Sequence, residues 1–250
     1  SFQTIKENGL IFTFDTDHYV LTGNDANEFD GQLYIPYDIC RDEFGCYQVT
    51  KLNAGALDGL TNIKSVNFWA EVDEIPADFF KGIGSQTDPI DAYFNWEYLS
   101  RMGGILSNQV CQLAGGFFNV FSIEGGDGLD IIYKLISDQE FWLTDIRLHD
   151  FEPDSYQLNI YTERWWNDQQ TLQLTKVLPE ATAKLANVAN KISRVSIYGS
   201  FIPEIDANAF AGIGKANAPV DLIISQEDFI NWGGNKLRSE ERRVGKECRS

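Results

Sequence analysis

The chain has 250 residues, of which 43% are hydrophobic and 23% charged, the composition of an ordinary globular protein with one large or two smaller domains. Its 37 acidic and 20 basic residues give a formal net charge of -17, which argues against nucleic acid and anionic lipid as partners, because both bind basic surfaces. No apolar run reaches the roughly 20 residues of a membrane helix, so we expect no transmembrane segment.

The first predicted elements are two β-hairpins. Leu10, Phe12 and Phe14 alternate with Ile11 and Thr13, and Tyr19 and Leu21 continue the pattern after a polar turn. The same alternation in Leu33–Ile35 and Tyr47–Val49 predicts a second hairpin. Alternation with a period of two is typical of strands with one buried face, so all four segments are expected to be strands.

A short internal repeat follows the hairpins. In Ala56–Leu60, and again 23 residues later in Phe79–Ile83, an apolar residue, a glycine and a second apolar residue recur. A period of this length falls in the range of leucine-rich repeats, which is about 20–29 residues. We therefore expect Gly59 and Gly82 to end short helices in a left-handed conformation, each helix lying between two strands.

A longer repeat divides the chain. Ile75–Gly104 aligns with Ile205–Gly234 at a constant shift of 130, and eleven of the thirty positions are identical. Self-similarity at a fixed shift indicates two copies of one structural unit. The sequence thus predicts a first unit over residues 1–104, a strand and glycine-rich linker over 105–127, and a second unit over 128–237.

Further elements define a candidate binding face. The apolar residues of Leu178–Ile192 are spaced three and four apart, which predicts a helix. Short strands are expected around Val66 and Val195, with their apolar side chains facing the core. The intervening side chains then face outward and form the candidate ligand-binding face: Ser65, Asn67, Trp69, Arg194, Ser196 and Tyr198. An outward aromatic residue at the same place in both units favours a recognition surface, and the alternative is that neighbouring repeats or loops cover these rings.

The last thirteen residues, Arg238–Ser250, differ from everything before them, since they are basic and polar and have no apolar periodicity. They resemble the in-frame translation of a widely used short-read sequencing adapter at every position. We therefore expect residues 238–250 to be an artefact, with the natural sequence cut off near Leu237 and both ends of the chain truncated. The alternative is a solvated basic tail.

The stretch Gly9–Ile83 resembles the BspA-like bacterial surface antigens, which are leucine-rich-repeat proteins. The matching features are a hairpin followed by the Ile35-Pro36 step, a strand ending in Val49–Leu52, and a repeat unit over Ala56–Phe68. The resemblance implies an α/β repeat fold, a leucine-rich-repeat-like partial solenoid with β-hairpins in two tandem copies. It also implies a secreted or surface-tethered bacterial module for binding and adhesion.

The sequence offers no catalytic or metal-binding motif. Its two histidines, His18 and His149, stand outside the known hydrolase and metal-site patterns. Asp25–Gly31 begins like a calcium loop, but Phe29 stands at the fifth position and no glutamate at the twelfth, so a polar turn is expected. We therefore expect no cofactor, no metal and no enzymatic activity.

The cysteines leave one question open. Cys40 and Cys46 flank the bend of the second predicted hairpin, where they could face each other across the strands. A disulfide fits an exported protein, and two reduced thiols are the alternative. Cys111 lies in an apolar stretch and is expected in the core.

The sequence is consistent with two functions. The first is a non-catalytic extracellular or cell-surface module that binds a protein partner. The second is a carbohydrate-binding or accessory module of a glycan-utilisation protein, because sugars stack on exposed aromatic rings. A hydrolase is a third class, which would need a pair of catalytic carboxylates. Neither a signal peptide nor an anchor is visible in the sequence, so the expected location rests on the resemblance.

Overall fold

The computed structural model describes residues 3–96, 104–107, 109–166, 170–199, 203–205, 208–214, 216–217 and 219–224. The chain divides into two compact units, unit 1 up to Ser122 and unit 2 from Ile123. Within the described ranges, no helix is both long and apolar enough to cross a bilayer.

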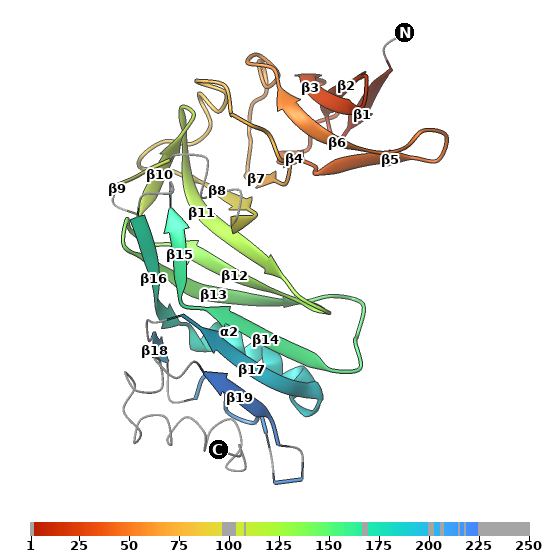
Figure 1. Ribbon diagram of the computed structural model, residues 1–250. Coiled ribbons are helices and arrows are strands. Elements are labelled where there is room, and N and C mark those ends of the chain that lie inside the picture. The colour runs from red at the N-terminus through yellow and green to blue at the C-terminus, as the bar shows by residue number, and fades with distance from the viewer. Residues whose placement is uncertain are drawn as a thin grey trace. The chain divides into compact units, whose positions relative to one another are not determined.

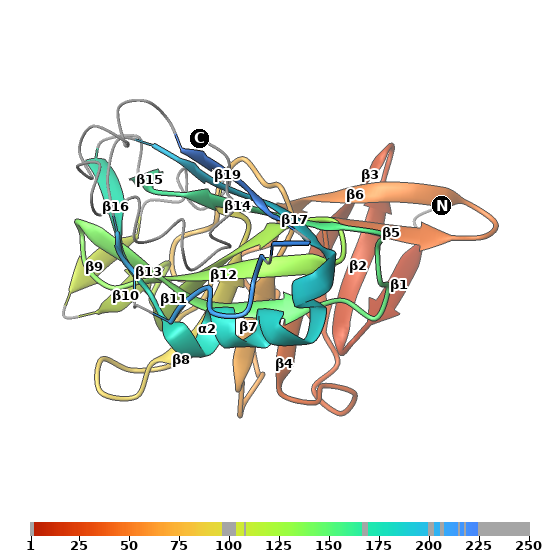
Figure 2. The same cartoon turned by 90° about the horizontal axis from the view of Figure 1, so that it is seen from below.

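The elements are shown in Figures 1 and 2. Unit 1 contains β1 (Thr4–Glu7), β2 (Leu10–Asp15), β3 (His18–Asn24), β4 (Gln32–Ile35), β5 (Asp38–Arg41), β6 (Gly45–Leu52), β7 (Ser65–Phe68), β8 (Ile90–Phe94), β9 (Ile105–Ser107), β10 (Val110–Leu113) and most of β11 (Gly116–Gly125). Unit 2 contains β12 (Leu129–Leu135), β13 (Glu140–Leu148), β14 (Tyr156–Tyr161), β15 (Glu163–Trp166), β16 (Gln170–Val177), α2 (Pro179–Thr182), the 3-10 helix η1 (Ala183–Lys191), β17 (Ile192–Tyr198), β18 (Glu204–Ile205) and β19 (Asp221–Ile224).

The first sheet of unit 1 has the strand order β1-β2-β3-β6-β5. Its β2–β3 hairpin is antiparallel, with Phe12 opposite Leu21, and confirms the first predicted hairpin. The second predicted hairpin is wrong, because β4 does not pair with β6. Instead β6 pairs antiparallel with β5 and parallel with β3. Alternation identified the strands correctly but carries no information about which strand lies beside which.

A parallel ladder forms the rest of unit 1. Strands β4, β7, β8 and β11 lie side by side and all run parallel. Their inward residues stand opposite one another along one buried line: Leu33, Val66, Ala92 and Val120. Behind this line Phe80 is fully buried, and its ring lies edge-on to Phe68 and Phe118 at centroid distances of 6.3 and 5.3 Å. These contacts make the aromatic core of the unit.

Unit 2 repeats the pairing pattern of unit 1. Strands β12 and β13 form an antiparallel pair, β13 runs parallel to β16, and β16 pairs antiparallel with β15. A second parallel ladder has the order β14-β17-β19, and these three strands lie side by side in Figures 1 and 2. The pairs β14–β17 and β17–β19 therefore correspond to β4–β7 and β7–β8 of unit 1.

The predicted helix over residues 178–192 is present in a modified form. It begins at Pro179 as α2 and continues as η1 to Lys191, with non-helical backbone angles at Val188. Leu185 and Val188 are buried, as the apolar spacing requires, and α2 packs against β13. Proline suits the first turn, because it lacks the N–H that this position leaves unbonded.

The predicted α/β leucine-rich-repeat solenoid is wrong. Among the described residues the structure is mostly β, with 51% of them in strands, the one short α-helix α2, and sheets curled into half-barrels. The segments Ala56–Leu60 and Phe79–Ile83, predicted as short helices, are mainly turns. Gly59 and Gly82 do adopt the expected left-handed conformation, with φ of 83° and 85°. The first turn of a helix is costly to form. A segment of only five residues that contains a glycine near its end therefore forms a turn instead of a helix.

The two units of the structure meet between Ser122 and Ile123, inside the segment 105–127 that the sequence places between its two predicted units. Residues 105–127, predicted as a strand and linker, contain β9, β10 and β11, and the division between units falls within β11. The predicted adapter-derived tail, residues 238–250, lies outside the described residues. Residues 225–234, the end of the second repeat segment, lie outside them as well.

Candidate functional site

The outward face of the unit 1 ladder carries a row of polar side chains, one from each strand. We call this the polar row: Gln32, Ser65, Asp91 and Asn119. The Ser65 hydroxyl donates to Gln32 Oε1 at 2.6 Å, and Asn119 Nδ2 donates to Asp91 Oδ1 at 3.1 Å. The row is thus made of two hydrogen-bonded pairs, which fix the direction of these side chains.

Beside it runs a second row, two residues further along each strand. We call this the aromatic row: Tyr34, Asn67, Tyr93 and Phe121. The rings of Tyr93 and Phe121 are stacked, with centroids 5.0 Å apart and planes 19° apart. Tyr34, on the edge strand, is 40% exposed. The parallel register places these side chains on one face, because residues opposite each other in a ladder point the same way.

The ladder of unit 2 has its own aromatic pair. Tyr161 and Tyr198 stand opposite each other on β14 and β17, and their rings are stacked with centroids 5.4 Å apart. The guanidinium of Arg164 lies 4.3 Å from the Tyr161 centroid and forms an ion pair with Glu124. This cation–π contact holds Tyr161 between a positive charge and a second ring. We call Tyr161 and Tyr198 the tyrosine pair.

Buried groups support the tyrosine pair. The Tyr133 hydroxyl accepts the Tyr161 backbone N–H at 3.4 Å. Burial raises the pKa of this hydroxyl well above its ordinary value, so it stays protonated at neutral pH. A small cavity of about 60 Å³ lies next to Tyr161, between the outward residues of β14 and the turn at Gly125 and Gly126.

The structure sorts the six residues predicted for the binding face. Ser65 and Asn67 lie on the outward face of β7, and Trp69 directly follows the strand. All three side chains are half-exposed. Tyr198 is 42% exposed, and Arg194 is half-buried.

Ser196 does not belong to the accessible face. Its side chain is fully buried, and its Oγ has no hydrogen-bond partner among the described residues. The prediction assumed that one face of β17 is open to solvent along its whole length. The burial pattern of β17 instead has three consecutive buried residues, from Val195 to Ile197.

Sequence reasoning missed most of the two faces. The residues it did not single out come from the other strands of the ladders: Gln32, Tyr34, Asp91, Tyr93, Asn119, Phe121 and Tyr161. The signal was present in the alternation of Ile90–Phe94 and Gly116–Gly125. It could not be used without the parallel pairing that brings these segments together.

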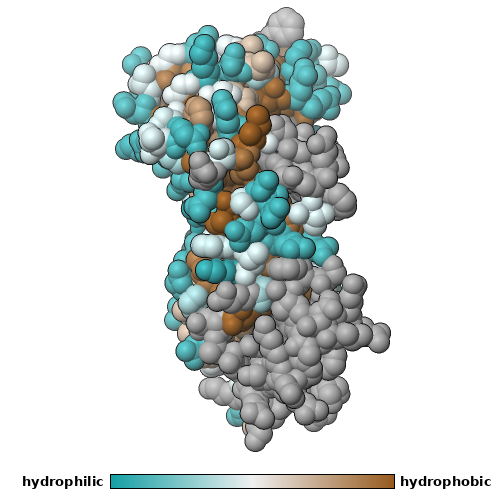
Figure 3. All heavy atoms as spheres, turned by 90° about the vertical axis from the view of Figure 1, so that its left-hand side faces the viewer, coloured by the Kyte–Doolittle hydropathy of each residue, from teal (hydrophilic) through white to brown (hydrophobic). Residues whose placement is uncertain are grey.

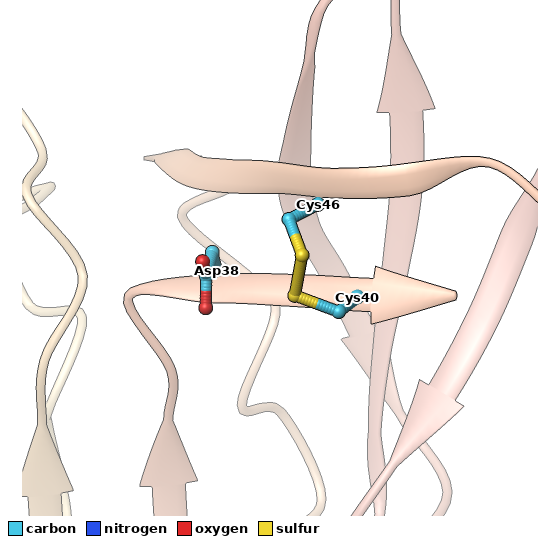
Figure 4. A group of neighbouring side chains, drawn as sticks. All are labelled: Asp38, Cys40 and Cys46. Atoms are coloured by element: carbon cyan, nitrogen blue, oxygen red, sulfur yellow. A yellow bond between two sulfur atoms is a disulfide. The ribbon is translucent and has the colours of Figure 1, made fainter. Parts of the chain in front are cut away.

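Cys40 and Cys46 form a disulfide between β5 and β6 (Figure 4). Asp38, on the same strand as Cys40, lies close to both sulfurs. The group does not fit a metal ion, because a cysteine binds metal as a thiolate and both sulfurs here are bonded to each other. The disulfide therefore ties the β5–β6 hairpin rather than making a metal site.

The remaining polar candidates are held in local contacts. Asp25, in the calcium-like segment, accepts a hydrogen bond from Lys6 at 2.9 Å and another from the Asn27 backbone. These bonds, the first above all, hold the pKa of Asp25 below its ordinary value. His18 contacts Asp17, and His149 contacts Asp130, each at 2.9 Å.

A larger cavity than the one beside Tyr161 lies in unit 1. It has a volume of about 510 Å³ and is lined by acidic and basic side chains, among them His18, Lys51, Glu71, Asp73 and Glu74. On the face seen in Figure 3, most coloured atoms belong to hydrophilic residues, and hydrophobic ones gather in small groups between them. Such a surface agrees with the acidic composition of the chain.

Comparison with known proteins gives this chain no relative: no family model, no curated protein and no solved structure matches it.

Proposed function

We propose that this protein is a non-catalytic, extracellular or cell-surface binding module whose partner is a protein. The observation that carries the proposal is the aromatic row of unit 1, in which four parallel strands present Tyr34, Asn67, Tyr93 and Phe121 in one register. Aromatic side chains supply much of the binding energy at protein interfaces, and polar groups around them keep water out. The polar row supplies such groups beside the aromatic row.

A protein partner is favoured over a glycan by the way the rings stand. Sugars bind on the open flat face of an aromatic ring, yet Tyr93 is stacked against Phe121, and Tyr161 against Tyr198. Arg164 lies over Tyr161 as well. Each of these rings therefore has one face covered by a neighbouring ring, and the ring edges suit apolar and edge-to-face contacts with protein side chains.

Two features support a location outside the cell. The Cys40–Cys46 disulfide is the kind of bond that persists in oxidising compartments. The resemblance of Gly9–Ile83 to bacterial surface antigens points the same way, and it stays a prediction.

The proposal is tested with the full chain on an array of extracellular proteins and on a glycan array. We expect saturable binding to a protein, weakened at least about tenfold by Tyr34→Ala or Tyr93→Ala in the aromatic row. Phe44→Ala is the matched control, because Phe44 is 50% exposed but lies at the tip of the β5–β6 hairpin, outside the strands that carry the aromatic row. Binding to glycans alone, or binding that both face variants leave unchanged, would contradict the proposal.

A further inference from the structure

Strands β8 and β19 occupy the same place in the two units. In unit 1 the register of β7 and β8 sets Ser65 opposite Asp91 and Val66 opposite Ala92. In unit 2 the register of β17 and β19 sets Arg194 opposite Asp221 and Val195 opposite Leu222. Asp91 and Asp221 are therefore equivalent residues on equivalent strands.

The two strands differ in what lies on their second edge. Strand β8 pairs there with β11, parallel and in register over five residues, from Phe118 opposite Ile90 to Ser122 opposite Phe94. Within the described part of the chain, β19 pairs with β17 and with no other strand. The backbone of a strand has hydrogen-bonding groups on both edges, so the second edge of β19 can accept another strand.

The side chains of β19 are less covered than those of β8. Ala92 is fully buried between Val66 and Val120, whereas the equivalent Leu222 is only half-buried. Tyr93 is covered by the Phe121 ring at 5.0 Å, whereas the equivalent Ile223 is 41% exposed. Apolar surface that β11 covers in unit 1 therefore stays accessible in unit 2.

We propose that the second edge of β19 binds an extended peptide strand that runs parallel to it and has the residue pattern of β11. The bound strand would place an aliphatic side chain beside Leu222 and an aromatic ring beside Ile223. It would also place an asparagine beside Asp221, as Asn119 stands beside Asp91 with an Nδ2-to-Oδ1 distance of 3.1 Å. Main-chain pairing at a sheet edge gives the affinity, and alternate side chains give the specificity.

This edge is a separate surface from the two outward faces, because its partner binds through backbone groups in the plane of the sheet. The proposal therefore does not depend on the nature of the partner that the aromatic row takes.

The first test uses a labelled peptide that copies Gly116–Gly125, with two added lysines for solubility, titrated with the full chain. Saturable binding is expected. Two further peptides carry N-methyl groups on alternate residues, one on Phe118, Val120 and Ser122, the other on Phe117, Asn119 and Phe121. Only one edge of a bound strand faces β19, so one methylated peptide should bind at least about tenfold more weakly than the other. No binding, or an equal effect of both methylation patterns, would overturn the proposal.

The second test locates the site. Ile223→Glu should weaken peptide binding at least about tenfold, because it sets a charge where the aromatic ring of the peptide would pack. Ile105→Glu is the matched control, since Ile105 is an exposed isoleucine in a strand of unit 1. Circular dichroism verifies that both variants keep the fold. Equal affinity of Ile223→Glu and the unchanged chain would overturn the assignment to β19.

Discussion

Thr50 and Thr175 are the bulge residues of equivalent strand pairs in the two units. Where β6 runs beside β3, the register steps from Val49 to Lys51 and leaves Thr50 without a counterpart. Where β16 runs beside β13, it steps from Leu174 to Lys176 and leaves Thr175 without one. Bulges are specific features of a fold and keep their place within it. The two units thus share one pattern of pairing down to the position of a single irregular residue.

The aromatic core of unit 1 depends on Phe80, which contacts rings from two strands of the ladder. Phe80→Ala should lower the free energy of unfolding by about 3–5 kcal/mol, since it removes a fully buried ring and leaves a cavity. Phe44→Ala, at an exposed hairpin tip, should change it by less than about 0.5 kcal/mol. Urea unfolding followed by fluorescence measures both. Equal effects of the two substitutions would contradict this core.

Two buried hydroxyls provide a matched pair for a second prediction. Ser196 Oγ has no partner among the described residues, whereas Thr162 Oγ1 donates to the Tyr198 carbonyl at 2.9 Å. Ser196→Ala should raise the free energy of unfolding by about 1 kcal/mol, because it removes an unsatisfied polar group. Thr162→Val should lower it by about 1 kcal/mol, because it removes a satisfied hydrogen bond, although the Tyr198 carbonyl still accepts the Thr162 backbone N–H at 2.7 Å. Thermal unfolding of both variants measures these changes. A stabilising Thr162→Val together with a destabilising Ser196→Ala would contradict the hydrogen bonding of these two buried hydroxyls.

The strands and the helix could largely be predicted from the sequence, but their partners could not. The alternation of Leu33–Ile35 correctly indicated β4, and the three-four spacing of Leu178–Ile192 correctly indicated α2 and η1. Such patterns report which side chains are buried. They do not report that β4 pairs with Ser65–Phe68, about thirty residues on, rather than with Tyr47–Val49.

Only part of the candidate site could be predicted, because the sequence does not show which strands lie side by side. Asn67 and Tyr198 were identified because the strands that carry them were recognised as repeats. Tyr93 and Phe121 were not, because a row of outward side chains exists only once four separate segments are aligned. Ser196 was wrongly placed on the accessible face, since a strand can be covered on both sides over part of its length.

The Lys6–Asp25 contact predicts a pH dependence. Its hydrogen bond lowers the pKa of Asp25 below 3.8 and raises that of Lys6 above 10.5. A carboxyl whose pKa is lowered in the folded state stabilises the fold at any pH above its unfolded-state pKa. This stabilisation is lost as the pH falls through the folded-state pKa. The lysine contribution is likewise lost at high pH, as the pH rises through its raised folded value. Carbon-13 NMR titration should therefore give Asp25 a lower pKa in the unchanged chain than in Lys6→Met, and an identical or higher value would contradict the contact.

The cysteines predict a stepwise thiol count. Burial raises the pKa of the Cys111 thiol to about 12, so it is protonated and shielded in the folded state. In a Cys248→Ser chain, Ellman's reagent should therefore find no reactive thiol when the protein is folded. It should find one thiol after unfolding without reductant, and three after unfolding and reduction with the reductant removed. Two or more reactive thiols in the folded chain would contradict the Cys40–Cys46 disulfide.

The most direct measurement is disulfide cross-linking between neighbouring strands of the two ladders, read by peptide mass spectrometry. Cysteines at Tyr34 and Asn67, or at Tyr161 and Tyr198, should link on mild oxidation, because opposite residues on adjacent strands lie about 4.8 Å apart. Cysteines at Tyr34 and Tyr93 should not link, because two strand spacings, about 9.6 Å, exceed the reach of a disulfide. Linking of the distant pair, or failure of either adjacent pair, would contradict the parallel ladders and the rows that they carry.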